Sequence, residues 1–343
     1  MSNIIASANL ANGLRTEFAD TYMAIRNRQA DSRLAKVMDL GVGATNRNHT
    51  FGYFDAAPHA EHWPRGSSIA SDGNKAKSFD VSVYNWGRRV PWHMDDRADD
   101  QTGTLFDSAK GAGNSFALLP ERFFFDLLLS TTTTLPGLPT AGDGVALFSA
   151  TNGDGGARFG ITGGNIITGG GVLNLSDILT DYYATMARYR GMQDGKGQPL
   201  FSNDILDAGV TIICGAHLEH VMEQAFIQKQ QAAGMSATGA QSGTIVAGAS
   251  QSNLSQDANR PVDIWPTSRI AASNDDWFVF LNGVPTPPTF LLDREGIVEQ
   301  TSLMGDQSAG DHTKTTGEEF IQWHSRQGAG VAGEPFGAIQ VNN

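Results

Sequence analysis

The chain has 343 residues, of which 40% are hydrophobic and 17% charged, and its 40 glycines indicate many turns. This length exceeds the usual size of one domain, so we expect two or three structural units. The formal net charge of −12 argues against tight binding to nucleic acid, because affinity for phosphate backbones comes from cationic contacts. No apolar run approaches the roughly 18 residues of a membrane span.

The charge differs between the two parts of the chain. Residues 1–95 contain 11 Lys and Arg against 9 Asp and Glu, a net of +2, whereas residues 96–343 contain 13 against 27, a net of −14. The near-neutral first part could lie across the acidic body of a neighbouring copy, although an ordinary acidic surface explains the same numbers. The single cysteine, Cys214, lies in an apolar run, which predicts an inert thiol.

The first predicted element is an amphipathic helix over residues 9–28. Its apolar residues recur at spacings of four and three, and they are Leu10, Leu14, Phe18, Tyr22 and Ile25. This apolar stripe needs a surface to cover it, so we expect Phe18 and Tyr22 to contact another copy of the chain. A weaker helical segment follows and ends at Gly41.

A long β-ribbon is predicted over residues 46–92. The strand "NHTFGYF" at 48–54 is expected to pair with "SFDVSVYNWGRRVPW" at 78–92, in which Phe79, Val81 and Val83 point to one side. A lone two-stranded ribbon is marginal in water, so we expect this face to lie on a second copy. Aromatic side chains are the expected anchors, and the full set of predicted contact residues is Phe18, Tyr22, Trp63, Arg65, Phe79, Trp86 and Trp92.

A long helix is predicted after the ribbon. Apolar residues recur at threes and fours from Leu105 to Leu127, and four aspartates between residues 95 and 100 favour the helix N-terminus. Pro120 should kink or split this helix. Residues 131–171 are rich in glycine and threonine, with short strand candidates such as "GVALFSA" at 144–150.

The second half of the chain mixes helices and strands. A helix is expected after an N-cap at Ser176, and "AGVTIICGAHLEHVMEQAFI" at 208–227 predicts a buried strand, a turn and a helix. Residues 231–256 indicate an exposed loop. This arrangement predicts an α+β fold rather than a regular βαβ repeat. The strand candidates of the final third are "PVDIWPTSRI", "DWFVFLNG", "TFLLDREGIVEQ", "EEFIQWHS" and "PFGAIQV".

Candidate metal sites are weak. The sequence "HAEHW" places His59, Glu61 and His62 close together near His49, but zinc needs three or four ligands that converge on one point. Polar side chains at a contact surface explain these residues better. The aspartates between residues 95 and 100 could hold a divalent cation, yet their pairing with the helix dipole explains them with fewer assumptions.

Candidate catalytic residues are equally weak. His217 and His220 lie on one predicted helix, but no nucleophile can be named beside them. The glycine runs at 153–156 and 169–171 lack the lysine and hydroxyl residue of a phosphate-binding loop and indicate turns. We therefore predict no catalytic site, no cofactor and no bound metal.

Four stretches follow one another in an order that resembles a known family. They are "SANLANGLRTEFADTYMA", "RNHTFGYFDAAPHAEHWPRGSSI", "KSFDVSVYNWGRRVPWHMDDRADD" and "EEFIQWHSRQGAGVAGEPFGAIQV". Together they are similar to the Mu-like major head subunit family, whose members are tailed-bacteriophage major capsid proteins with the Hong Kong 97-type fold. In one departure, Cys214 and Gly215 stand where such proteins often have a proline-containing turn.

The resemblance implies a division of the chain and a function. The expected function is that of a major capsid protein, which forms hexamers and pentamers of an icosahedral shell around the double-stranded DNA of a tailed phage or Mu-like prophage. The expected parts are an N-terminal arm (1–45), an extended loop that lies on the neighbouring subunit (46–92), a peripheral domain with a spine helix (93–172), an axial domain (173–290) and C-terminal strands (291–343).

Partners and location follow from the same resemblance. The expected partners are other copies of the chain, portal and scaffold proteins, and packaged DNA through non-specific contacts, with no membrane. The expected location is the virion, after assembly in the bacterial cytoplasm. Two alternatives stay open. Strand-rich repeats without a long helix would favour a tail or adhesin subunit, and a deep pocket of titratable groups would favour a hydrolase.

Overall fold

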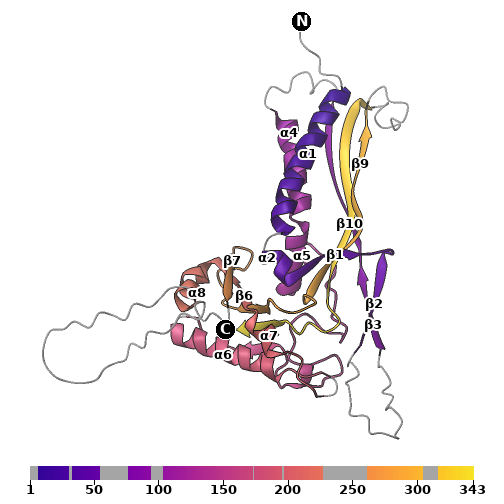
Figure 1. Cartoon of the computed structure of the whole chain (residues 1–343). Coiled ribbons are helices and arrows are strands. Elements are labelled where there is room, and N and C mark those ends of the chain that lie inside the picture. Colours follow the sequence, from indigo (N-terminus) through magenta and orange to yellow (C-terminus); the bar gives the residue numbers. More distant parts are fainter. Residues whose placement is uncertain are drawn as a thin grey trace, which may run out of the picture.

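The computed structural model describes residues 7–30, 33–54, 76–93, 103–172, 174–194, 197–226, 261–303 and 316–343. These residues form three parts (Figure 1). The first, which we call the tall layer, packs long helices against a four-stranded sheet. The second is a five-stranded sheet with its own helices, the lower sheet. The third is a two-stranded ribbon. Helices and sheets both occur, which confirms the predicted α+β class.

The sheet of the tall layer joins strands from both ends of the chain. Its order is β1 (Met38–Gly43), β9 (Thr289–Ser302), β10 (Glu318–Val331) and β4 (Tyr84–His93). β1 runs parallel to β9, and the other neighbours are antiparallel. Along β10, buried residues such as Ile321 and Trp323 alternate with half-buried ones, which is the period of a strand with one covered face.

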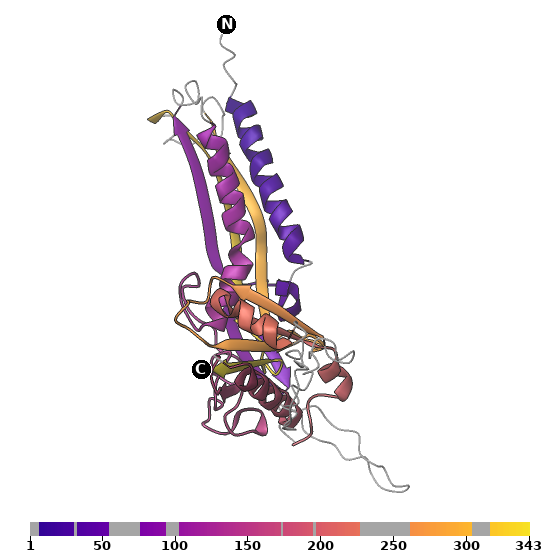
Figure 2. The ribbon, with the colours of Figure 1, turned by 90° about the vertical axis from the view of Figure 1, so that its left-hand side faces the viewer.

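Helices α1 (Ser7–Ala30) and α4 (Thr104–Ala117) lie side by side over that face (Figures 1 and 2). The apolar stripe of α1 is covered by α4 and β10 of the same chain. Leu14 is fully buried, and the ring of Phe18 stacks on Trp323 with 4.2 Å between centroids. The predicted helix is confirmed, but the prediction that its stripe needs another copy is wrong for Leu14 and Phe18, which the chain itself buries. Tyr22 and Ile25 are half-buried.

The long helix predicted after the ribbon is split at its proline. α4 ends at Ala117, and α5 (Leu119–Leu128) begins after Leu118, with Pro120 in the first turn of α5. This position tolerates proline because the first N–H groups of a helix have no partner within the helix. The predicted break is therefore confirmed.

The lower sheet is covered on both sides. Its order is β5 (Ile166–Thr168), β11 (Ala338–Asn342), β8 (Trp277–Leu281), β6 (Val210–Gly215) and β7 (Val262–Thr267). On one side, residues such as Ile212 and Trp277 pack with α6 (Leu175–Gly191), α7 (Asn203–Asp207) and α8 (Glu219–Phe226). On the other side, Ile213 and Phe278 join the core of the tall layer. The five strands predicted for the final third correspond to β7 to β11.

Several local predictions were wrong. The segment expected to be helical up to Gly41 forms a short helix, α2 (Arg33–Val37), and then strand β1, because β9 offers it a partner. "GVALFSA" forms turns, since the carbonyl of Leu147 is bound by Arg158 and Asn165 instead of a strand. The cap of α6 is Asn174 rather than Ser176. The aspartates at 95–100 and the loop at 231–256 lie outside the described residues.

Candidate assembly site at the ribbon base

The ribbon is shorter than predicted. β2 (Asn48–Phe54) and β3 (Ala76–Ser82) pair antiparallel, from Asn48 opposite Ser82 to Phe54 opposite Ala76. The expected strand at 78–92 divides at Val83, and its second half, β4, leaves the ribbon to pair with β10. The expected ribbon boundary at residue 92 is therefore wrong, because β4 finds its partner in the tall layer.

The base of the ribbon lies on its own chain. Val81 and Val83 are buried against Phe290 and Leu292 of β9. The prediction that a second copy must cover this face is wrong for these two valines. Phe79 is half-buried and stacks with Phe51 of β2, whose ring lies 4.8 Å from that of Phe290, centroid to centroid. We call this contact of β2 and β3 with β9 and β10 the ribbon base.

Glycines of β10 and beyond allow the ribbon to approach closely. A Cβ on Gly328 would collide with the carbonyl oxygen of Ser82 in β3. At the other end of the base, the ring of Tyr53 lies between Gly142 and Gly333, where a Cβ on Gly333 would lie 2.6 Å from Tyr53 Cγ. The two glycines are joined because Gly142 N donates to Gly333 O at 2.9 Å. Tyr53 thus anchors the far end of β2 in a slot that only small residues can form.

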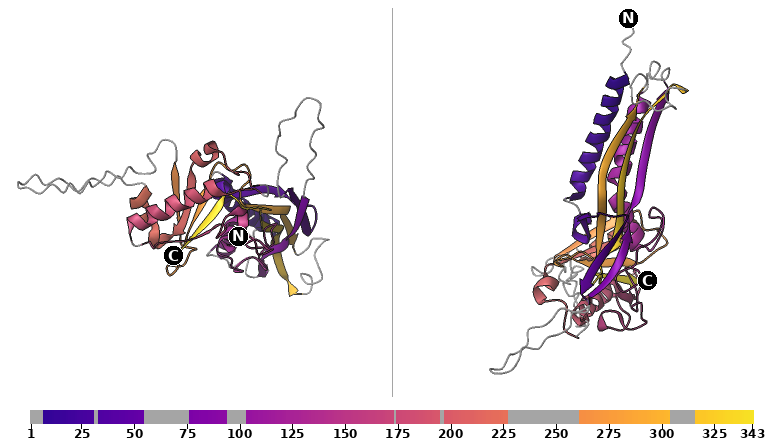
Figure 3. Two further views of the ribbon diagram at one scale, coloured as in Figure 1. Left: turned by 90° about the horizontal axis from the view of Figure 1, so that it is seen from below. Right: turned by 90° about the vertical axis from the view of Figure 1, so that its right-hand side faces the viewer.

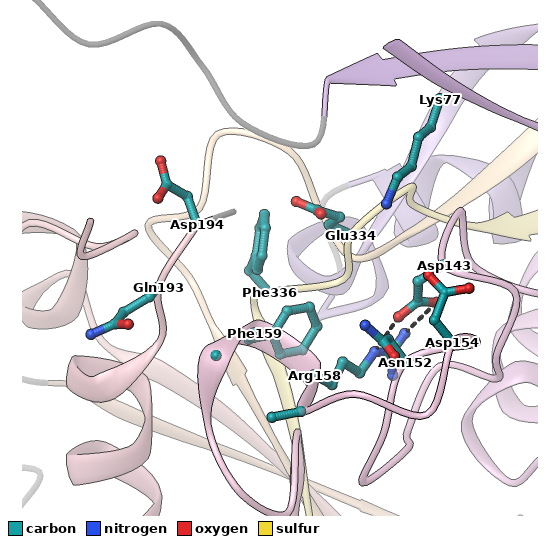
Figure 4. Close-up of a pocket in the computed structure, with 12 residues that line it drawn as sticks. Lys77, Asp143, Asn152, Asp154, Arg158, Phe159, Gln193, Asp194, Glu334 and Phe336 are labelled. Carbon is teal, nitrogen blue, oxygen red and sulfur yellow. Dashed lines mark hydrogen bonds and ion pairs between the residues drawn. The ribbon is translucent and has the colours of Figure 1, made fainter. Parts of the chain in front are cut away.

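A cavity of about 280 Å³ lies beside the ribbon base (Figure 4). Lys77 of β3 and Glu334 of the β10–β11 connection line one side, and Asp194 after α6 lies across from them. Phe159 and Phe336 lie next to each other with 5.0 Å between ring centroids. The described lining contains no Ser, Thr, Cys or His. It therefore offers no hydroxyl or thiol nucleophile and no imidazole base, and its titratable groups are carboxylates, Lys77 and Arg158.

One wall of this cavity is a buried ion pair. Arg158, 1% exposed, donates to the carboxylate of Asp143 at 2.7 and 3.2 Å and to Leu147 O at 2.9 Å. Burial lowers the pKa of the Arg158 guanidinium, and Asp143 acts in the opposite direction. The next residue, Phe159, has a φ of 57°, which is strained for a side chain of its size. The arrangement holds the glycine-rich segment in one shape.

Sequence reasoning missed this wall. Asp143, Asp154 and Arg158 are the only charged residues between positions 131 and 171, and such isolated charges in a glycine-rich segment are a signal for an internal pair. Asp126 is a similar case, because this carboxylate among the apolar residues at the end of α5 accepts from Thr134 N at 2.6 Å and Leu135 N at 2.7 Å. Both carboxylates fix the loops that follow α5.

The predicted contact residues fall into three groups. Phe18 and Trp92 are buried within the chain, and Trp92 Nε1 donates to Glu319 Oε2 at 2.7 Å, which contradicts the expectation that they reach another copy. Tyr22, Phe79 and Trp86 are half-buried, and their contact with a neighbour stays a prediction. Trp63 and Arg65 lie outside the described residues.

The remaining candidate residues show no assembled chemistry. Burial raises the pKa of the Cys214 thiol to about 12, in agreement with the predicted inertness. His217 Nε2 lies 3.1 Å from Asp275 Oδ1, and His220 contacts Gln224. His59, Glu61 and His62 lie outside the described residues. Within the described residues, no three potential ligands gather around a metal position, and none of the helices is apolar and long enough to span a membrane.

Comparison with known families decides the identity. A family model described as phage capsid protein matches residues 76–341, which includes the lower sheet, strands β3, β4, β9 and β10 and helices α4 and α5, but not α1, α2, β1 or β2. The chain belongs to the phage capsid protein family. This membership confirms the predicted capsid role and the place of the protein in the virion. No curated protein matches the sequence, and the narrower Mu-like assignment and the other domain boundaries stay predictions.

Solved structures show that this capsid protein has the predicted Hong Kong 97-type fold. The capsid structure of the cyanophage P-SCSP1u is similar, with a TM-score of 0.51, 12% identity and coverage of 89% of this chain and 86% of that chain. The mature capsid of bacteriophage PhiM1 is similar with a TM-score of 0.53 and 8% identity, over 91% of this chain and 86% of that chain. The structure of Mycobacterium phage Adephagia is similar with a TM-score of 0.50 and 10% identity, over 91% of this chain and 89% of that chain. At these identities the likeness concerns the fold alone.

Proposed function

We propose that copies of this capsid protein assemble into hexamers and pentamers, which close an icosahedral head around the double-stranded DNA of a tailed phage or Mu-like prophage. The observation that carries the proposal is the family match over residues 76–341. The position of the ribbon supports it, because β2 and β3 stand at one side of the body (Figure 3) while their base is fixed on β9 and β10. With both strands fixed on their own chain, residues 55–75, which connect them, are the segment that we propose reaches a neighbour.

The net charge of the chain supports a capsid shell that binds packaged DNA weakly. A formal net charge of −12 disfavours tight contacts with phosphates, so packaged DNA would meet the shell through weak, non-specific contacts. Portal and scaffold proteins are the further partners in this proposal. The alternative of a tail or adhesin subunit rests on strand-rich repeats, and the paired helices α1 and α4 of the tall layer weigh against it.

Expression of the chain alone tests the proposal. The purified protein should sediment as large particles, and negative-stain images should show closed shells. In a second variant, residues 55–75 are replaced by Asn-Gly, a two-residue turn that joins antiparallel strands. We expect this variant to stay folded by circular dichroism but to lose shells. A wild type that stays monomeric would refute self-assembly, and normal shells from the shortened variant would refute the role of the ribbon tip.

A further inference from the structure

A second cavity, of about 420 Å³, forms a groove between β4 and α4 of the tall layer. It lies at the free edge of the four-stranded sheet, where β4 is the outermost strand (the purple strand in Figure 2). This groove is separate from the ribbon base. Its lining residues are Arg88, Arg89, Val90 and Pro91 from β4 and Leu105, Ser108, Gly111 and Ser115 from α4.

Small side chains on α4 leave the groove open. Ser108, Gly111 and Ser115 recur at helical spacing on the side that faces β4. A Cβ on Gly111 would have no atom within 4 Å, so this part of the groove is empty space rather than a close helix–strand contact. Val90 is buried and Leu105 half-buried, and they give the groove an apolar floor.

The described lining of the groove is cationic, and no carboxylate of the described residues forms an ion pair with it. No Asp or Glu is among its described lining residues. Arg88 is exposed and forms no ion pair with another described residue of the chain. Arg89 is turned to a different neighbour, because its guanidinium carbon lies 3.9 Å from the centre of the Phe320 ring. Arg88 is therefore the guanidinium that can receive a carboxylate.

We propose that this groove receives an acidic segment of a second copy of the chain, with a carboxylate bound to Arg88. The inference rests on the proposed self-assembly and names one contact within it. Charge complementarity favours a second copy, because residues 96–343 contain 27 Asp and Glu against 13 Lys and Arg. The apolar floor fits a polypeptide segment better than a nucleic-acid backbone, which is recognised mainly through cationic and polar contacts.

The groove, and not the strand edge itself, is the recognition element. Pro91 lacks an N–H group, and Arg88 and Arg89 bring charge to the edge of β4. Both features disfavour the addition of a further strand at an exposed sheet edge. The incoming segment therefore binds through side chains in the groove, and one carboxylate on Arg88 fixes its position.

Thiol labelling tests the contact directly. Cys214 is fully buried and the pKa of its thiol is about 12, so a cysteine introduced at Ser108, which is exposed, is the reactive thiol of the native chain. Ser108→Cys should react with a maleimide quickly in isolated subunits and at least about tenfold more slowly in particles assembled without nucleic acid, since thiol reactivity depends on access. Asn114→Cys, exposed on the same helix but outside the groove, is the matched control and should react alike in both.

Each other outcome overturns the inference. Equal labelling of the Ser108→Cys thiol in particles and subunits would show an empty groove. Slow labelling in the isolated subunit would show that the chain's own residues cover it. Protection that requires packaged DNA would assign the groove to phosphate, and equal protection of Asn114→Cys would show general burial of the helix. A wild type that stays monomeric overturns the proposed function as well, which separates the two failures.

Charge reversal gives a second measurement. Arg88→Glu should place a carboxylate against the incoming acidic segment, so particle yield should fall at least about tenfold, the equivalent of 1.4 kcal/mol. Arg88→Lys should keep much of the yield. Arg190→Glu makes the same charge change at an exposed site on α6 and should assemble like wild type. Unchanged yield with Arg88→Glu would overturn the inference.

Discussion

The tall layer and the ribbon base are held by different kinds of contact. The tall layer buries large rings completely, among them Trp323, Phe123 and Phe124, and burial of each such side chain contributes roughly 1.5–3 kcal/mol. The ribbon base buries Val81 of β3 and Val83 directly after it, and depends otherwise on close approach to Gly328 and on the slot that holds Tyr53. The tall layer is thus stabilised by a large buried apolar core, whereas the ribbon base is stabilised by a few close contacts.

The largest expected effect comes from a change in the tall layer. Trp323→Ala removes the ring that stacks on Phe18 and leaves a cavity under α1, so the free energy of unfolding should fall by about 3–5 kcal/mol. Denaturant unfolding followed by far-UV circular dichroism measures this loss. Phe320→Ala, on the same strand but half-buried, should lose far less. Equal losses from the two variants would contradict the assigned core.

A smaller, local effect is expected at the ribbon base. Tyr53→Ala should empty the slot between Gly142 and Gly333, and Gly333→Ala should force the ring out of it. Hydrogen exchange should become faster in β2 and β3 of both variants, while amides of α4 and β10 keep their protection, because local opening requires less free energy than global unfolding.

Gly52→Ala is the matched control for this experiment. On β2, a Cβ at Gly52 would have as its nearest atom Lys77 O, at 4.0 Å, so exchange in the ribbon should stay as in wild type. If Tyr53→Ala instead accelerates exchange throughout the tall layer, the two regions are not independent and the comparison fails.

The smallest expected effect lies where the two regions meet. Asp293 follows the β9 residues under the ribbon, and burial raises its pKa above the usual 3.8, while Arg26 of α1 and Gln327 lower it. The folded state binds the Asp293 proton more tightly than the unfolded state does, so ionisation of Asp293 lowers the stability of the fold. This loss of stability is absent below pH 3.8 and complete above the raised pKa. Asp293→Asn should therefore gain thermal stability relative to wild type as pH rises from about 4 to 7. A constant difference in melting temperature would contradict this.

Local patterns predicted the elements better than their partners. The spacing from Leu10 to Ile25 and the alternation in β10 are fixed by helix and strand geometry, so both could be found in the sequence. The partner of Phe18 could not, because Trp323 is distant in the chain. The alternation around Val83 also continues from β3 into β4 and contains no sign that the two halves pair with different strands.

The candidate site was harder to predict than the fold. In the sequence, nothing distinguishes Tyr53 from other aromatic residues in strands. Its slot exists only in the folded chain, where Gly142 and Gly333 lie on either side of the ring. Arg158 and Asp143 lie in a segment without helix or strand periodicity, where hydrogen bonds to loop carbonyls decide the conformation. Such contacts depend on three-dimensional proximity, and a pattern of residue types does not record it.

The strand order of the tall layer also sets the timing of subunit formation. β4 ends at His93, but its sheet partner β10 begins only at Glu318. In the same way, β1 ends at Gly43 and its partner β9 begins at Thr289. At about 5–20 residues synthesised per second, the early strands remain without partners for on the order of 10 to 50 seconds. Pairings so distant in sequence close slowly. A nascent chain therefore cannot complete this sheet, and with it the groove between β4 and α4, until the residues of β10 have been synthesised.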